Sequence, residues 1–259
     1  MENHTQPQPS HFGTALLISF IRLPLLLVGA AATLGLLAVA GRPLAFPPAP
    51  DLASLYFIVV NAISLVILRR IVHREGRTLH DLLGFSRARM GKDILWGLLW
   101  VAVLYLPFAA AVIGTMAALY GPDTFTSFER VFAPAETSAV TFSPAVTLTL
   151  ALATAILFPL LNAPTEELYY RGYAQPALTD ATGKPWLGVL IPTVGFSLQH
   201  ILLAPTMPGM LVYAVAFFVW GLGAALIYAR QRRLMPLVVA HFCTNFFFGL
   251  APLIIFFAT

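Results

Sequence analysis

The fold is decided by a stretch that runs from Pro144 to Gly172 and reads PAVTLTLALATAILFPLLNAPTEELYYRG. About twenty of its residues are nearly continuous hydrocarbon, which is the length that a helix needs to cross a bilayer. Two adjacent carboxylates, Glu166 and Glu167, follow directly, and Arg171 comes one helical turn later. Ionisable groups at such positions cost about 2.5–3.5 kcal/mol each even on insertion scales, so their presence indicates a functional site.

The composition extends this reading to the whole chain of 259 residues. Hydrophobic residues make up 59% and charged residues 10%, whereas soluble domains average about 25% charged residues. With a mean hydropathy of +0.82, the chain cannot hide its apolar surface in a soluble globule, so its solvent is largely lipid. The net charge of +4 does not indicate a nucleic-acid partner, because the basic residues cluster between apolar segments. The single cysteine, Cys243, excludes an intrachain disulfide.

Seven stretches are long and apolar enough to span a membrane, which predicts an all-α, polytopic membrane protein. Basic residues number seven in the linker Arg69–Lys92, two in Pro164–Pro185 and three in Arg230–Arg233, with one or none in the alternate linkers. The positive-inside rule therefore predicts a cytoplasmic amino terminus and an external carboxyl terminus. The seven stretches are Gly13–Ala40, Leu52–Leu68, Ile94–Leu119, Pro144–Ala163, Trp186–Ala204, Met210–Ala229 and Leu234–Ala258.

One continuous membrane domain is expected, since no internal repeat divides the chain. Residues 1–12 are predicted to form a polar cytoplasmic tail, residues 13–143 the amino-terminal helices and loops, and residues 144–259 the part that carries the candidate site. The first span also resembles a secretory signal, because Arg22 gives it a basic residue and residues 38–40, Ala-Val-Ala, are similar to a cleavage site. Its long apolar run and the extended segment before it argue against cleavage.

The two carboxylates are expected to have different roles. Glu167 and Arg171 are four residues apart with the glutamate first, which is the favourable order for an ion pair within one helix. Glu166 points about 100° away and has no such partner, so it is the carboxylate available for chemistry. The alternative is that Glu166 lies beyond the helix end and is simply solvated, but residues 168–170 continue apolar. Pro164 is expected to kink the helix beside this site.

Two histidines and an amide complete the candidate site. His200 lies inside the fifth span, and His241 and Asn245 share one face of the seventh. Each histidine alone is more often a hydrogen-bonded core residue, but their joint presence with a carboxylate on three neighbouring helices favours a shared site. Such groups accept a proton from water and donate hydrogen bonds to an oxyanion. Glu166, His200 and His241 also offer three ligands to zinc and leave a fourth position for water.

The residues that other classes of intramembrane protease require are missing from the chain or unsuitably placed. The chain has no His-Glu dipeptide, so the His-Glu-x-x-His zinc motif is absent, and every aspartate lies in a linker or at the edge of a span. Ser197 follows the beginning of a nucleophile elbow without its closing glycine. Cys243 points to a different helix face from His241. A serine or cysteine nucleophile is therefore disfavoured.

Three short motifs stand out by their order along an all-helical chain: Glu166-Glu167-x-x-x-Arg171, Phe196-x-x-x-His200 and His241-x-x-x-Asn245. Together they resemble the hallmark motifs of the CAAX protease and bacteriocin-processing (CPBP) family, also called the ABI family. Its eukaryotic branch is the type II CAAX prenyl endopeptidase. The resemblance covers roughly residues 144–250, so residues 144–259 are expected to form a CPBP-like catalytic core.

The resemblance implies an intramembrane endopeptidase with its site in a cavity open to membrane and cytosol. It assigns water activation to Glu166 and His200, oxyanion stabilisation to His241 and Asn245, and a supporting role to the Glu167–Arg171 pair. Members of the family have been classed as metalloproteases and as metal-free glutamate proteases, so zinc stays open. The expected substrate is a membrane-associated protein or peptide, and the expected location is the cytoplasmic membrane of a bacterium or archaeon.

Two alternatives remain at this level. A non-catalytic membrane scaffold, a bacteriocin-immunity protein or a regulatory protein would keep the same fold without turnover. A transporter would use the glutamate and the histidines to relay protons, but the chain shows no duplicated half.

Overall fold

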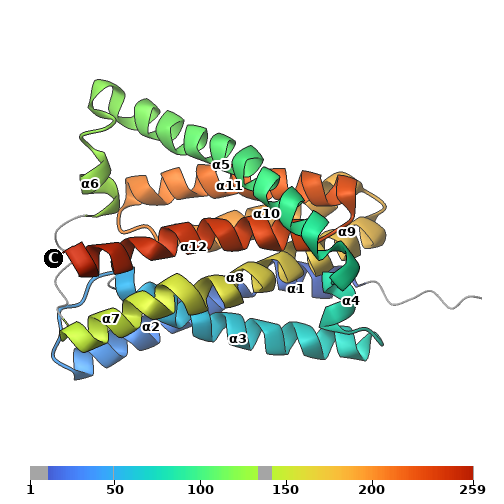
Figure 1. Ribbon diagram of the computed structural model, residues 1–259, viewed down its shortest axis with the longest axis horizontal. Coiled ribbons are helices and arrows are strands. Elements are labelled where there is room, and N and C mark those ends of the chain that lie inside the picture. The colour runs from blue at the N-terminus through green and yellow to red at the C-terminus, as the bar shows by residue number, and fades with distance from the viewer. Residues whose placement is uncertain (1–10, 49, 134–141, 259) are drawn as a thin grey trace, which may run out of the picture.

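A computed structural model describes residues 11–48, 50–133 and 142–258. Within these ranges the chain is helical and contains no strand, which confirms the predicted all-α class (Figure 1). Most of the predicted polar tail, residues 1–10, lies outside the described residues, as do residues 134–141 of the predicted external loop.

The first part of the chain crosses the bundle three times. The first crossing consists of two consecutive helices that meet at Ile21, and the third is the longest helix, with 31 residues. Short helices lie at the ends of the third crossing. The helices are α1 (Phe12–Phe20), α2 (Arg22–Val39), α3 (Pro50–Arg74), α4 (Leu79–Leu83), η1 (Arg87–Arg89), α5 (Met90–Tyr120), η2 (Gly121–Asp123) and α6 (Phe128–Phe132).

The second part begins with one continuous rod in which α-helix alternates twice with π-helix, and three more helices follow. The rod consists of α7 (Pro144–Leu152), the π segment η4 (Ala153–Leu157), α8 (Phe158–Glu167), the π segment η5 (Leu168–Ala174) and α9 (Gln175–Thr182). The remaining helices are α10 (Pro185–Ile201), α11 (Met207–Gln231) and α12 (Met235–Ala258).

The described residues contain six helices that are long and apolar enough to cross a membrane, judged by length and composition. The fifth predicted span, Trp186–Ala204, is the one that is not among them; it corresponds to α10, which has only 17 residues. It is shorter than the roughly 20 residues that a crossing needs. Pro205 limits the helix on this side, because the residue before a proline, here Ala204, is driven out of the helical conformation. The helix ends at Ile201, and residues 202 and 203 form a turn.

Helix α12 runs through the bundle with α5 and α11 on one side and α7 and α8 on the other (Figure 1). Helix α3 packs beside α8 and α2 packs against α3, while α10 packs against α11, α9 and α1. The start of α1, the end of α3, α4 and α9 lie at one end of the bundle, and the carboxyl terminus lies at the other (Figure 1). The side of the membrane on which each end lies stays a prediction.

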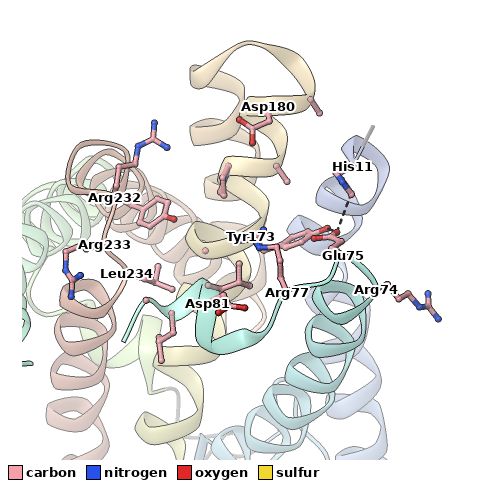
Figure 2. A pocket seen from close by; sticks show the side chains of 18 residues that line it. His11, Arg74, Glu75, Arg77, Asp81, Tyr173, Asp180, Arg232, Arg233 and Leu234 are labelled. Atoms are coloured by element: carbon pink, nitrogen blue, oxygen red, sulfur yellow. Dashed lines mark hydrogen bonds and ion pairs between the residues drawn. The ribbon is translucent and has the colours of Figure 1, made fainter. Parts of the chain in front are cut away.

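The two linkers richest in arginine, Arg69–Lys92 and Arg230–Arg233, meet at the end of the bundle where α1 begins. They line a pocket of about 780 Å³ together with the beginning of α1 and the η5–α9 segment (Figure 2). In this pocket Tyr173 donates a 2.5 Å hydrogen bond to Glu75, and His11 lies 3.3 Å from the same carboxylate oxygen. Basic side chains of both linkers, among them Arg74, Arg77, Arg232 and Arg233, therefore lie at the same end of the bundle.

The distribution of polarity is reversed relative to a soluble protein. Large apolar side chains cover the outside, for example Leu95 at 70% and Leu106 at 68% exposure. Charged side chains occupy the interior, among them Arg22 and Glu166, each with 0% exposure. Buried charges require partners, and outward-facing hydrocarbon requires lipid. The fold is therefore that of a polytopic membrane protein with a polar centre.

The π segments explain how the rod accommodates its prolines. Helix α8 contains Pro164 and continues to Glu167, and a π segment begins directly after it at Leu168. Each of the two π segments ends just before an α-helix with a proline in its first turn, Pro159 in α8 and Pro176 in α9. Proline supplies no N–H and excludes the carbonyl four residues earlier. A wider π turn removes both conflicts, and such turns are frequent at functional sites.

Candidate active site

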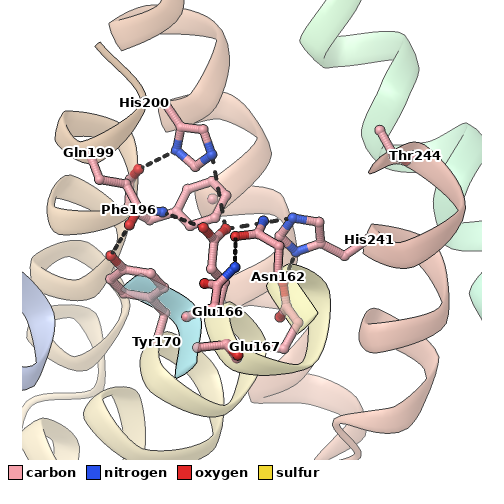
Figure 3. A network of polar contacts seen from close by, with 12 residues as sticks. Asn162, Glu166, Glu167, Tyr170, Phe196, Gln199, His200, His241 and Thr244 are labelled. Carbon is pink, nitrogen blue, oxygen red and sulfur yellow. Dashed lines mark hydrogen bonds and ion pairs between the residues drawn. The ribbon is translucent and has the colours of Figure 1, made fainter. Parts of the chain in front are cut away.

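Glu166 lies on α8 at the centre of a buried polar network (Figure 3). Its Oε1 accepts two hydrogen bonds of 2.9 Å, one from Arg22 Nη2 and one from Gln199 Nε2. Glu166 has no partner on its own helix, as expected, but it pairs with Arg22 from the first crossing of the bundle, which a spacing rule within one helix cannot detect. The alternative of a solvated Glu166 is excluded, since the side chain is fully buried.

The two predicted histidines converge on the other oxygen of this carboxylate. Glu166 Oε2 lies 3.9 Å from His200 Nε2 and 3.6 Å from His241 Nε2. No hydrogen bond reaches this oxygen from any described residue. The carboxylate is thus asymmetric, with one oxygen held by donors and the other facing two imidazoles. Helices α8, α10 and α12 each contribute one of these three side chains.

Different hydrogen bonds orient the two imidazole rings. His200 Nδ1 lies 2.7 Å from the carbonyl oxygen of Phe196. Because a carbonyl only accepts, this nitrogen carries a proton, and in the neutral ring Nε2 keeps its lone pair. The ring also stacks on Phe217 with centroids 3.7 Å apart. His200 is therefore held with its basic nitrogen toward Glu166.

His241 lies between two carboxylates. Its Nδ1 is 2.9 Å from Glu167 Oε1, while Nε2 faces Glu166. The predicted ion pair is also present, because Arg171 Nη1 donates to the same Glu167 oxygen at 3.1 Å. Glu167 thus serves two helices, and it fixes the orientation of His241 in addition to neutralising Arg171. Such a carboxylate–histidine contact sets which ring nitrogen holds the proton.

Asn245 follows His241 by one turn on α12, as expected. Its Nδ2 is buried and has no hydrogen-bond partner within the described ranges, which is also true of the Oε2 atoms of Glu166 and Glu167. Buried polar atoms normally find a partner, and a small polar molecule such as water satisfies several of them at once. Two acceptors and one donor on neighbouring helices are suited to a water and a substrate carbonyl.

The side chains present do not fit the zinc set formed by Glu166, His200 and His241. No group of three or more His, Cys, Asp or Glu side chains in the described part of the chain is placed to hold a metal ion. In addition, the Arg22 guanidinium lies against Glu166, and a positive charge at this distance repels a dication. The geometry therefore gives the zinc ligand set no support.

The structure also describes the two disfavoured nucleophiles. The Ser197 hydroxyl donates a 2.7 Å hydrogen bond to the carbonyl oxygen of Ala214 and not to a histidine or carboxylate. Cys243 is a free, partly buried cysteine.

Sequence reasoning missed the side chains that donate to Glu166 Oε1 or extend its hydrogen-bond network. Arg22 was interpreted as a feature of a signal segment, and Gln199, Asn61 and Asn162 received no role. Asn61 Nδ2 donates to Asn162 Oδ1 at 3.0 Å, which extends the network from α3 to α8. The signal that could have found them is the cost of polar groups inside apolar spans, because this cost applies to arginine and asparagine as it does to glutamate.

Comparison with known proteins points to one family. A family model described as Rce1-like, type II CAAX prenyl endopeptidase, matches residues 147–247. This range contains Glu166, Glu167, His200, His241 and the other site residues of α8, α10 and α12, and it excludes α2 and α3. No curated protein and no solved structure matches the chain.

Proposed function

We propose that the protein is an intramembrane endopeptidase that hydrolyses peptide bonds of membrane-associated substrates, because residues 147–247 match the Rce1-like, type II CAAX prenyl endopeptidase family model. Glu166 is the general base, His200 assists it, and His241 with Asn245 stabilises the oxyanion. The observation that carries this proposal is the buried Oε2 of Glu166, which faces two imidazole nitrogens and receives no hydrogen bond from the described residues.

In the first step a water molecule attacks the carbonyl carbon of the scissile bond. The water loses a proton to Glu166 Oε2, directly or through the Nε2 lone pair of His200. A positioned base of this kind accelerates such a step by about 10²–10⁴-fold. Burial supports this role, because a carboxylate shielded from bulk water keeps its lone pair for the bound water.

In the second step negative charge develops on the carbonyl oxygen. Asn245 Nδ2 is a buried donor that no described residue uses, and it is one turn from His241. His241 donates to this oxygen only when Nε2 carries a proton, which together with the contact from Nδ1 to Glu167 means the imidazolium form. Collapse of the intermediate then releases the amine with the proton that Glu166 had taken.

The test is Glu166→Gln in purified protein. The introduced carboxamide keeps an oxygen that accepts from Arg22 and Gln199, so the fold is expected to persist, while the base is removed. With a library of membrane-anchored peptides, the wild-type protein is expected to release fragments detectable by mass spectrometry, and the variant none. Ser197→Ala is the matched control, since Ser197 bonds only to a backbone carbonyl and should leave turnover unchanged. Equal cleavage by wild type and Glu166→Gln would remove the carboxylate from the reaction, and no cleavage by either would favour a non-catalytic membrane protein.

A further inference from the structure

The Arg22 guanidinium joins four helices at the site. Its Nη2 donates to Glu166 Oε1 at 2.9 Å, and its Nε donates to Gln199 Oε1 at 2.7 Å. Its Nη1 donates to Asn61 Oδ1 at 2.9 Å and to Ser64 Oγ at 3.2 Å. The side chain has 0% exposure, so it cannot exchange these partners for water. A planar guanidinium with its nitrogens engaged in this way is fixed in position and orientation.

Gln199 forms a bridge between the arginine and the carboxylate. Its Oε1 accepts from Arg22 Nε and also from the Tyr170 hydroxyl at 3.0 Å. Since an arginine nitrogen only donates, the amide has one possible orientation, and its Nε2 must face Glu166. The same Glu166 oxygen thus receives one donor from Arg22 directly and one through Gln199.

We propose that Arg22 is a positioning residue for the reaction and that it acts through Glu166, with Gln199 as its bridge. This inference rests on the proposed function. By holding Oε1 only, Arg22 compensates the charge of the carboxylate and leaves Oε2 free toward His200 and His241. A guanidinium that paired with both oxygens would occupy the lone pairs that accept the proton.

The consequence is that the active site extends beyond the segment that matches the family model. Arg22 comes from α2, and Asn61 and Ser64 come from α3, both before residue 147. The buried carboxylate has its counter-charge on a helix 144 positions earlier in the chain. The first two crossings are therefore part of the site, and the division of the chain after residue 143 does not separate catalytic from non-catalytic parts.

The test compares Arg22→Met with Arg22→Lys by steady-state kinetics, with rates normalised to folded protein. Loss of the guanidinium lets the carboxylate shift, and misplacement by about 1 Å costs about 100-fold in rate. Arg22→Met is expected to lower kcat about 100-fold with KM within about threefold, the pattern of a group that acts only on the chemical step. Arg22→Lys keeps the charge and is expected to stay within about tenfold of the wild-type kcat.

Two further variants keep the test decisive if Arg22→Met fails to fold. Gln199→Met removes one donor from Glu166 without stranding a charge, and it is expected to lower kcat about tenfold. Leu26→Ala is the matched control, because Leu26 is buried on the same helix and packs in the cluster that includes Phe57, away from the carboxylate. It should lower stability and leave kcat per folded protein within about twofold.

Each result either supports or overturns the positioning role of Arg22. Wild-type kcat in Arg22→Met, or equal losses in Leu26→Ala and Gln199→Met, would overturn the positioning role. The proposed function fails separately, if wild type and Glu166→Gln have the same activity. In that case Arg22 would be only a structural ion-pair partner, and the positioning role falls with the function.

Discussion

Glu167 offers the sharpest quantitative test of the buried network, because it neutralises Arg171 and orients His241 at once. Replacing Glu167 with alanine strands the Arg171 guanidinium in the interior. Removing one member of a buried ion pair typically costs about 3–5 kcal/mol. Arg171 keeps a 3.2 Å hydrogen bond to the Gly221 carbonyl and lies 4.5 Å from the centroid of the Phe196 ring. These remaining contacts place the expected loss at the lower end, about 3 kcal/mol.

Thermal unfolding of the purified protein measures this loss. By the scaling of globular domains of similar size, about 2–4 °C per kcal/mol, the melting temperature should fall by roughly 6–12 °C. The double variant Glu167→Ala/Arg171→Met removes both charges and should recover most of the loss, since replacing both partners of a buried pair is far less costly than removing one.

A second ion pair supplies the control. Asp93 pairs with Arg233 at the end of the bundle, where the arginine side chain is 25% exposed. Asp93→Ala lets Arg233 turn to solvent, so the free energy of unfolding should fall by only about 1 kcal/mol. If Glu167→Ala melts within about 2 °C of wild type, or no lower than Asp93→Ala, the assignment of Glu167 as the partner that neutralises Arg171 is refuted.

Two more predictions address the metal and the helix packing. Treatment with 1,10-phenanthroline is expected to leave turnover unchanged, and metal analysis of the active protein should find far less than one zinc per chain; a loss of activity that added zinc restores would contradict this. Gly249→Ala should destabilise the protein by about 1–3 kcal/mol, because the new Cβ would lie 2.6 Å from the Thr154 carbonyl oxygen and 3.1 Å from Ala155 Cα. Gly114→Ala is the control, since no described atom lies within 4 Å of its Cβ position, and a melt in which both variants behave alike would exclude close packing at Gly249.

Much of the fold could be predicted, because a helix that crosses lipid must be apolar over about 20 residues. Hydrophobic length predicted the helical class and six of the seven expected spans. The length of α10 was overestimated, since hydropathy does not register the effect of Pro205 on the residue before it. The two π segments were not predicted, because local hydrogen bonding decides them and composition does not.

The candidate site could be predicted in part, for a similar reason. Glu166, His200 and His241 were expected together because each lies as a polar residue inside an apolar span, and the structure brings them within 3.9 Å. Arg22 obeys the same rule, being a charged residue inside the first apolar stretch. It was assigned to a signal-like feature because pairings over 144 positions leave no trace in local spacing. Gln199 was overlooked because its role depends on the rotation of α10 relative to α2.

The position of Arg22 has a consequence for how the chain enters the membrane. During synthesis at about 5–20 residues per second, the 144 positions between Arg22 and Glu166 correspond to a delay on the order of 10 s. Through that interval the cation has no anionic companion from α8. Asn61 and Ser64 on α3 emerge much earlier and already offer oxygens to Nη1. In the nascent chain, the α2–α3 hairpin thus supplies hydrogen-bond acceptors to Arg22 until α8 is synthesised.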